Sequence, residues 1–385
     1  MKNSKWVYYI SLVIFFIYLF LSIYEVYVSE LIGNISRPYL VLFVVFMFLN
    51  IRMRSVTVDQ TILFIWLLFY CLSLLWTTNI GQASLYIATI IIMSSIAILC
   101  GNCYFSKNFV DTIVAFYKWC SISLAFLGVF YSEPISVDNS VRMVLTIGGV
   151  QPDPNNLVAL YTIGSGLALC SLQKDSKHKV VNLLGLFLCV YSILITGSRS
   201  GILILGVQFL IWIFYINRGT GVVMKTLLGL SLILGIGYIF YNFIDIETME
   251  RLLGLGDLEF TDSTGRKDMW QVALEHFCSS PIVGNGWGSY PAHNTFLTIL
   301  ADIGLVGLGL IILYLSRLYV RILKYNDYYA LMIFVSGMIQ SFLLDAQNKR
   351  FFWNIIILSV LIINSYADST RNLTCTSKTS INNQV

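Results

Sequence analysis

Residues 284–307 read GNGWGSYPAHNTFLTILADIGLVG and take the chain from a glycine-rich polar loop into an apolar helix. The apolar character after Asn294 continues to about residue 316, a length that suits a helix crossing a bilayer. His293, one of 3 histidines in the chain, lies at this transition. The stretch therefore predicts a membrane helix with a side chain at its entrance that can exchange a proton near neutral pH.

The composition of the whole chain supports a membrane protein. Of 385 residues, 57% are hydrophobic and 11% are charged, whereas soluble domains carry about 25% charged residues. A water-soluble core could not absorb so much apolar surface, so we expect an all-α, polytopic transmembrane helical bundle. The net charge of +4 gives no reason to expect a nucleic-acid partner.

Apolar runs long enough for helical spans occur along most of the chain, and we expect about twelve spans. The runs lie at about 6–24, 39–52, 60–76, 85–100, 109–131, 155–172, 180–197, 201–216, 226–244, 295–316, 328–344 and 352–366. They form one predicted integral membrane domain, residues 1–367. The polar residues 368–385 are expected to form a disordered tail.

The distribution of Lys and Arg predicts the orientation in the membrane. These residues are more frequent in the segments on the same side as the N-terminus, which places both termini in the cytoplasm. Two longer connections, 132–154 and 245–294, then lie outside the cytoplasm. The second is expected to contain short interfacial helices, since Trp270 and Phe277 fall on one apolar face of a helix that begins near Gly265.

Arg199 is the only charged residue between Val180 and Ile216, within the sequence TGSRSG. Flanking glycines permit close backbone approach, and Ser198 or Ser200 could cap the helix that follows. A guanidinium beside a helix N-terminus suits a phosphate group. The alternative is an arginine that only ends a helix and extends to the interface.

Arg266 lies in the first turn of the predicted helix after STG, where a positive charge opposes the helix dipole. That placement suggests a nearby anion. A salt bridge with Asp262 or Asp268 is the alternative explanation.

His293 could accept a proton from an attacking hydroxyl group, or serve only as an interfacial structural residue. We expect no metal site, because neither His178 nor His276 completes a ligand set with it. Asp302 is a carboxylate within a span, which indicates a functional or paired role. Its possible partners are Lys118 and Arg350, and Arg350 could instead join the anion site or anchor the last span.

These residues together predict an outward-facing pocket with arginines for phosphate and a histidine for proton transfer. The chain contains no P-loop sequence and no paired acidic motif for a metal–nucleotide complex. We therefore expect the donor to be a lipid-borne phosphate or pyrophosphate, with no cofactor.

Several motifs in order resemble the bacterial O-antigen ligase and O-antigen polymerase superfamily. They are TGSRSG, STGR, PIVGNGWG, HN followed by nine residues and GLVG, and QPDPNN at 151–156 with Asp153 and Asn155. The resemblance covers about residues 151–315. It implies a GT-C-like fold in the inner membrane and metal-independent transfer from an undecaprenyl-pyrophosphate-linked glycan.

The resemblance also implies roles for individual residues. Arg199 and Arg266 match the pyrophosphate-binding arginines, and His293, followed by Asn294, matches the histidine that activates the acceptor. Asp302 stands where family members commonly have Glu. The acceptor would be a growing glycan for a polymerase, which we favour because the outer loop is short, or lipid A–core for a ligase. A chain-length regulator or another envelope assembly protein would be a partner.

Two other classes of protein remain as alternatives. A flippase or transporter of lipid-linked sugars would carry ionisable residues along a path through the membrane, whereas the notable charges here gather at one side. The other alternative is a non-catalytic scaffold in an envelope complex.

Overall fold

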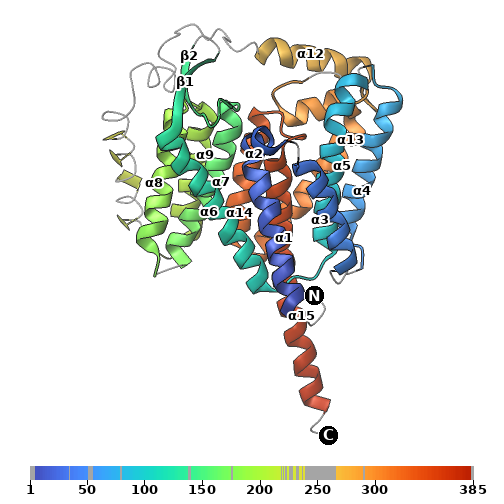
Figure 1. The fold of residues 1–385 in the computed structure, drawn as a ribbon. Coiled ribbons are helices and arrows are strands. Elements are labelled where there is room, and N and C mark those ends of the chain that lie inside the picture. The colour runs from blue at the N-terminus through green and yellow to red at the C-terminus, as the bar shows by residue number, and fades with distance from the viewer. Residues whose placement is uncertain are drawn as a thin grey trace.

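Long helices lie side by side along the length of the molecule (Figure 1). The structure is a computed structural model that describes residues 5–382 except for 34, 51–54, 79, 138–139, 175–176, 218, 220, 222, 225–228, 231–233, 236, 239–265 and 289–290. In the first part of the chain the elements are α1 (Lys5–Ile23), α2 (Glu25–Ile32), α3 (Ser36–Asn50), α4 (Val58–Leu72), η1 (Ser73–Leu75), α5 (Ile80–Asn102), α6 (Lys107–Tyr131), β1 (Ser132–Val137) and β2 (Ser140–Leu145). They are followed by α7 (Pro154–Lys174), α8 (Lys179–Ile195), α9 (Arg199–Leu210), the π-helical η2 (Ile211–Ile216), α12 (Arg266–Ser279), α13 (Thr295–Tyr325), α14 (Tyr328–Leu343) and α15 (Arg350–Asn382).

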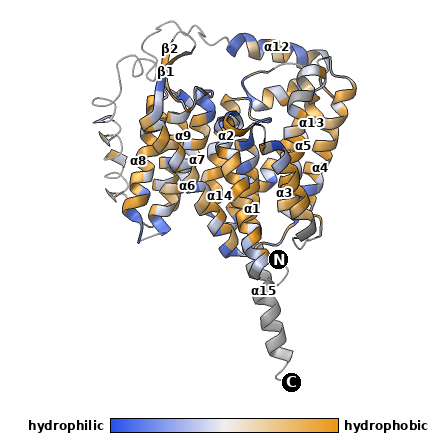
Figure 2. Ribbon diagram, in the orientation of Figure 1, coloured by the Kyte–Doolittle hydropathy of each residue, from blue (hydrophilic) through white to orange (hydrophobic). Residues whose placement is uncertain are grey.

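Hydrophobic residues dominate the middle of these helices, and hydrophilic residues gather toward the two ends of the bundle (Figure 2). Among the described residues, 6 helices are long and apolar enough to cross a membrane, and four shorter apolar helices lie at Tyr86–Asn102, Lys179–Ile195, Tyr328–Leu343 and Arg350–Tyr366. The predicted all-α membrane bundle is therefore confirmed. The run at 226–244 falls largely outside the described residues, so the number of twelve spans stays a prediction.

A β-hairpin within residues 132–145 departs from the all-helical expectation. β1 and β2 pair antiparallel, with Ile135 opposite Arg142 and Glu133 opposite Val144. The hydroxyl of Tyr27 on α2 donates to the carbonyl of Leu145 at 3.0 Å, which holds the hairpin to the bundle. Its alternating branched residues are a recognisable strand signal. With α12, which lies across the same end, the hairpin marks what we call the α12 end of the molecule (Figure 1).

Helix α7 is deeply buried, and every one of its residues from Leu157 to Ser171 is buried. A Cβ added at Gly164 would lie 3.0 Å from Ser121 and 3.1 Å from Cys189, so α6 and α8 approach its backbone closely. Gln208 of α9 accepts from Ser165 at 2.7 Å and donates to Ser336 of α14 at 2.7 Å. Small residues and buried polar contacts of this kind stabilise helix contacts in membranes, where the hydrophobic effect between helices is weak.

Helix α13 is broken where the sequence predicts a continuous span. Ile303 and Gly304 have non-helical backbone angles, and Gly304 has φ 61° and ψ −164°, a conformation essentially restricted to glycine. The amides of Asn285 and Gly286 donate to the carbonyls of Ala301 and Asp302 at 3.0 and 2.9 Å.

Beyond the break, the amides of Leu305 and Val306 donate to the carbonyls of Pro281 and Ile282 at 2.9 and 3.2 Å. The loop at 281–286 therefore satisfies the backbone groups that the break exposes, as irregular backbone inside a membrane requires. A Cβ at Gly304 would lie 2.4 Å from the carbonyl oxygen of Ile282. The glycines around this break thus permit two backbones to meet, and we do not need a ligand to explain them.

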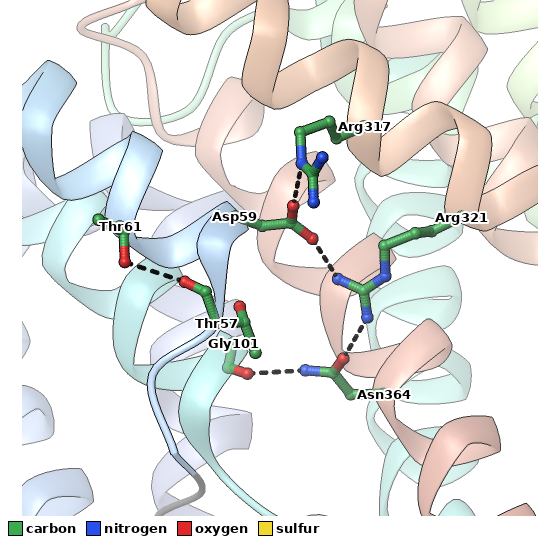
Figure 3. Close-up of polar contacts among 7 residues, drawn as sticks. All are labelled: Thr57, Asp59, Thr61, Gly101, Arg317, Arg321 and Asn364. Atoms are coloured by element: carbon green, nitrogen blue, oxygen red, sulfur yellow. Dashed lines mark hydrogen bonds and ion pairs between the residues drawn. The ribbon is translucent and has the colours of Figure 1, made fainter.

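The second half of α13 is fixed at the opposite end of the bundle by a polar network (Figure 3). Asp59, in the first turn of α4, accepts from Arg317 Nε at 2.5 Å and from Arg321 Nη1 at 2.9 Å. Arg321 also donates to Asn364 of α15 at 2.7 Å, and Asn364 donates to the carbonyl of Gly101 at 2.9 Å. Four helices are joined by one buried carboxylate and its partners.

Helix α15 continues to Asn382 and extends beyond the bundle (Figure 1). The disordered tail that polar composition predicts at residues 368–385 stays a prediction.

Replacing Gly304 by alanine should destabilise the fold, because the new methyl group meets backbone atoms at a positive φ. We expect G304A to lose about 2–4 kcal/mol of stability. The matched control is G309A in the same helix, where nothing lies within 4 Å of an added Cβ and alanine should be neutral or stabilising. Thermal unfolding of both purified variants in detergent tests this, and equal midpoints would contradict it.

Candidate functional site

Most of the predicted site residues occupy three helix starts at the α12 end of the bundle. These are the starts of α7, α9 and α13, and each begins with a short polar turn. The turns come from distant parts of the sequence, and side chains of α14 and the α14–α15 connection link them.

Arg199 is the first residue of α9 and its side chain is exposed. Gly197 before it has φ 63°, which makes the tight turn from α8 possible. Ser198 holds the N-cap position without capping the helix: its hydroxyl group contacts Ser200 Oγ at 2.8 Å and donates to Asn155 Oδ1 at 3.1 Å. Gly201 serves close packing, because an added Cβ would lie 2.5 Å from Ile193.

The predicted pair Asp153 and Asn155 lies beside this turn. Asp153 is exposed, and its carboxylate accepts the amide of Asn155 at 2.7 Å where α7 starts. Gln340, near the end of α14, donates to the carbonyl of Asn155 at 3.2 Å. The structure therefore brings Asp153, Asn155 and Ser198 together and attaches them to α14.

His293 has φ 47°, a left-handed conformation that is uncommon for a residue with a Cβ. Its amide donates to Asp345 Oδ2 at 2.9 Å, and the amide of Asn294 donates to Asp345 Oδ1 at 3.2 Å. Two adjacent amides on one carboxylate fix the direction of the backbone. The partly buried imidazole is consequently carried on a turn with a defined orientation.

Asn294 is the N-cap of α13, and its side-chain oxygen accepts from Phe296 N at 3.0 Å and Leu297 N at 3.1 Å. This is the preferred use of Asn at a helix start. Thr298 also donates to Asp345, and Thr295 donates to the carbonyl of Leu344 at 2.6 Å.

The sequence analysis did not predict a role for Asp345. The available signal was an acid directly after the apolar run of α14.

Asp302 is completely buried, at the last helical residue before the break in α13. Tyr70 of α4 donates to its carboxylate at 3.3 Å. The candidate partner Lys118 instead donates to Ser171 at 3.0 Å and Asn182 at 2.8 Å. Asp302 therefore lies at the centre of the contact between α4 and α13, as a residue that supports the first half of α13.

Arg350 forms an ion pair with Glu25 and donates to the carbonyl of Leu21 at 3.4 Å. It is buried at the first residue of α15. These contacts tie α15 to the turn between α1 and α2, which favours the anchoring role over membership of an anion site.

Arg266 begins α12, and its side chain is partly exposed. The helix packs through Ala273 against Ala292 and Ala301, so it lies over the first half of α13. Asn285 donates to the carbonyl of His276 and accepts from Ser279 at 3.0 Å, which holds the other end of α12. The candidate partner Asp262 lies outside the described residues.

The arrangement gives the α12 end two exposed or partly exposed arginines and one partly buried imidazole on a turn whose backbone is fixed. Among the residues that the structure describes, there is no group of three or more His, Cys, Asp and Glu side chains placed to hold a metal ion. We therefore assign no residue as a metal ligand. The positive groups are suited to an anion, and the imidazole is suited to exchanging a proton.

Residues 184–312 match the family model described as O-antigen ligase. This match includes Arg199, Arg266, His293 and Asp302, and it confirms the resemblance to the O-antigen ligase and polymerase superfamily. A chain of the solved structure described as "Structural coordination of polymerization and crosslinking by a peptidoglycan synthase complex" is 17% identical, with a TM-score of 0.46 over 79% of this chain and 96% of that chain. No curated protein matches the chain.

Replacing Asp345 by alanine should loosen the entrance of α13, because two amides and one hydroxyl group lose a charged acceptor. We expect D345A to lower stability by about 2–4 kcal/mol, with D345N intermediate. The control is E275A, which removes an exposed carboxylate bonded to Gln271 on α12 and should cost less than about 0.5 kcal/mol. Unfolding in detergent measures the difference in stability. Equal losses of stability for D345A and E275A would refute the clamp, by which we mean the contacts of Asp345 with the amides of His293 and Asn294.

Proposed function

We propose that this member of the O-antigen ligase and polymerase superfamily is a membrane glycosyltransferase that polymerises undecaprenyl-pyrophosphate-linked repeat units into a surface polysaccharide. The observation that carries the proposal is the clamp of Asp345 on the amides of His293 and Asn294. His293 has a left-handed backbone conformation, and a partly buried carboxylate holds that conformation in place. The predicted membrane domain and the family match support the same class of enzyme.

In the proposed reaction, the arginines bind the donor and the histidine activates the acceptor. Arg199 and Arg266 contact the pyrophosphate oxygens, where their charges stabilise the leaving group. An acceptor hydroxyl oxygen attacks the anomeric carbon of the donor glycan, and the bond from that carbon to the pyrophosphate oxygen breaks. The hydroxyl proton passes to the imidazole of His293, and undecaprenyl pyrophosphate leaves.

The clamp suits general base catalysis because it fixes the backbone that carries the imidazole before the substrate arrives. Preorganisation of this kind avoids reorientation during the reaction. Asp345 acts in this scheme as a positioning residue, and Asp302 with Tyr70 supports the helix that carries the histidine. Charge neutralisation by arginine makes the proposed transfer independent of a metal ion.

From the Lys and Arg bias we infer that the α12 end lies at the extracytoplasmic face of an inner membrane. The lipid-linked donor is presented at this face. A second candidate function is that of an O-antigen ligase, which transfers a finished glycan to lipid A–core. The family match supports the class of membrane glycosyltransferase that both candidates share. Partners in either case are the donor, the glycan or lipid acceptor, membrane lipids, and a chain-length regulator or other envelope assembly protein.

A strain lacking this chain should retain single repeat units on its lipid acceptor, because joining of repeats is lost while their transfer continues. Electrophoresis of the surface polysaccharide and mass spectrometry of undecaprenyl-linked glycans provide the measurement. Long chains that accumulate on undecaprenyl would instead identify a ligase. Repeats confined to the cytoplasmic leaflet would identify a flippase and exclude both transferase candidates.

Replacing His293 by asparagine should abolish transfer while preserving the fold, because asparagine tolerates a left-handed backbone but cannot accept the proton. We expect H293N to lower the polymerisation rate by at least about 100-fold. H276N on α12 is the matched control and should retain activity. Normal polymer length from H293N, at equal expression and thermal stability, would show that His293 is structural.

A further inference from the structure

The opposite end of the bundle contains a cavity that the proposed transfer does not use. It has a volume of about 380 Å³ and lies between α6, α7, α14 and α15. Lys107, Lys118 and Lys174 line it, together with Asp111 and Asp327. Three lysines face two aspartates, so the lining carries a net positive charge.

Lys118 is the most informative residue of this cavity. It lies 11 residues after the start of α6 at Lys107, a distance of about 16 Å along the helix. It is only 7% exposed, and Ser171 and Asn182 accept from its ammonium group. A charged side chain this deep in a span is costly and indicates a function.

The other two lysines are held at the cavity by aromatic rings. The Lys107 nitrogen lies 3.6 Å from the centre of the Tyr366 ring, and the Lys174 nitrogen lies 4.7 Å from that of Tyr329. Such contacts fix the position of an ammonium group. The ring is neutral, so it does not cancel the positive charge.

Both carboxylate oxygens of Asp327 accept hydrogen bonds from other residues of the protein. Its Oδ1 accepts the amide of Ala330 at 2.9 Å and caps α14. Its Oδ2 accepts the hydroxyl of Tyr366 at 2.8 Å and lies 3.9 Å from Lys174. The carboxylate thereby organises the wall of the cavity, and its charge is shared among several donors.

We propose that this cavity binds a phosphate group at the end of the bundle opposite α12. Basic pockets between membrane helices suit lipid headgroups, and this volume is sufficient for one. The Lys and Arg bias assigns this end to the cytoplasmic leaflet. The same chemistry would accept a free phosphate, and the site is separate from the proposed transfer site at the α12 end.

The test uses the full-length protein purified in a neutral detergent, with thermal unfolding followed by tryptophan fluorescence. One titration adds phosphatidylglycerol in mixed micelles against phosphatidylcholine, and another adds inorganic phosphate. We expect saturable stabilisation of the wild type. A response to phosphatidylglycerol alone identifies a lipid headgroup, and a response to inorganic phosphate identifies the free anion.

The double variant K107Q/K174Q should raise the probe concentration at half-saturation by about tenfold. K324Q, an exposed lysine at the same end that does not line the cavity, is the matched control and should leave the curve unchanged. The single variants K107Q and K174Q replace the double variant if it fails to fold, with several-fold weakening expected for each. Identical curves for the cavity variants and K324Q, or no response of the wild type to either probe, would overturn the proposal. Binding is measured without glycan transfer, so failure here is distinct from failure of the proposed function.

Discussion

Buried backbone amides and carbonyls need hydrogen-bond partners, and this constraint accounts for the arrangement around α13. The helix opens at Ile303 and Gly304, and the loop at 281–286 supplies partners on both sides of the opening. Neither segment satisfies its backbone alone. The loop, the break and the half-helix before it therefore form one unit, and the candidate site is built on that unit.

The first half of α13 is short, yet it is held at several points. Asp345 and Asn294 fix its start, Tyr70 contacts the carboxylate of Asp302 at its end, and α12 covers its side through Ala273. Apart from the local cap by Asn294, these contacts come from different parts of the chain. The backbone that carries His293 at the entrance of this segment is thus fixed by contacts from several helices.

The sequence predicted features that depend on local composition. Apolar runs predicted the helices, and the motifs around Arg199 and His293 indicated the family. Interruptions set by contacts distant in the sequence were missed: the break at Gly304 depends on the loop at 281–286, and the role of Asp345 depends on how α14 meets α13. The possible capping role of Ser198 was not realised for the same reason, because its hydroxyl group donates to the side-chain oxygen of Asn155 on α7. A carboxylate can be seen in a sequence, but the direction in which it points is set by packing.

The polar network of Asp59, Arg317, Arg321 and Asn364 also bears on the order in which the chain is assembled (Figure 3). Asp59 precedes Arg317 by 258 residues, so during synthesis the carboxylate of α4 waits for its guanidinium partner until α13 emerges. The clamp at His293 closes later still, because Asp345 follows it by 52 residues. Asn364 of α15 emerges after Asp345, so the carboxylate that holds the turn at His293 becomes available before the polar network is complete. A nascent chain that stops before α14 is complete contains His293 without that carboxylate.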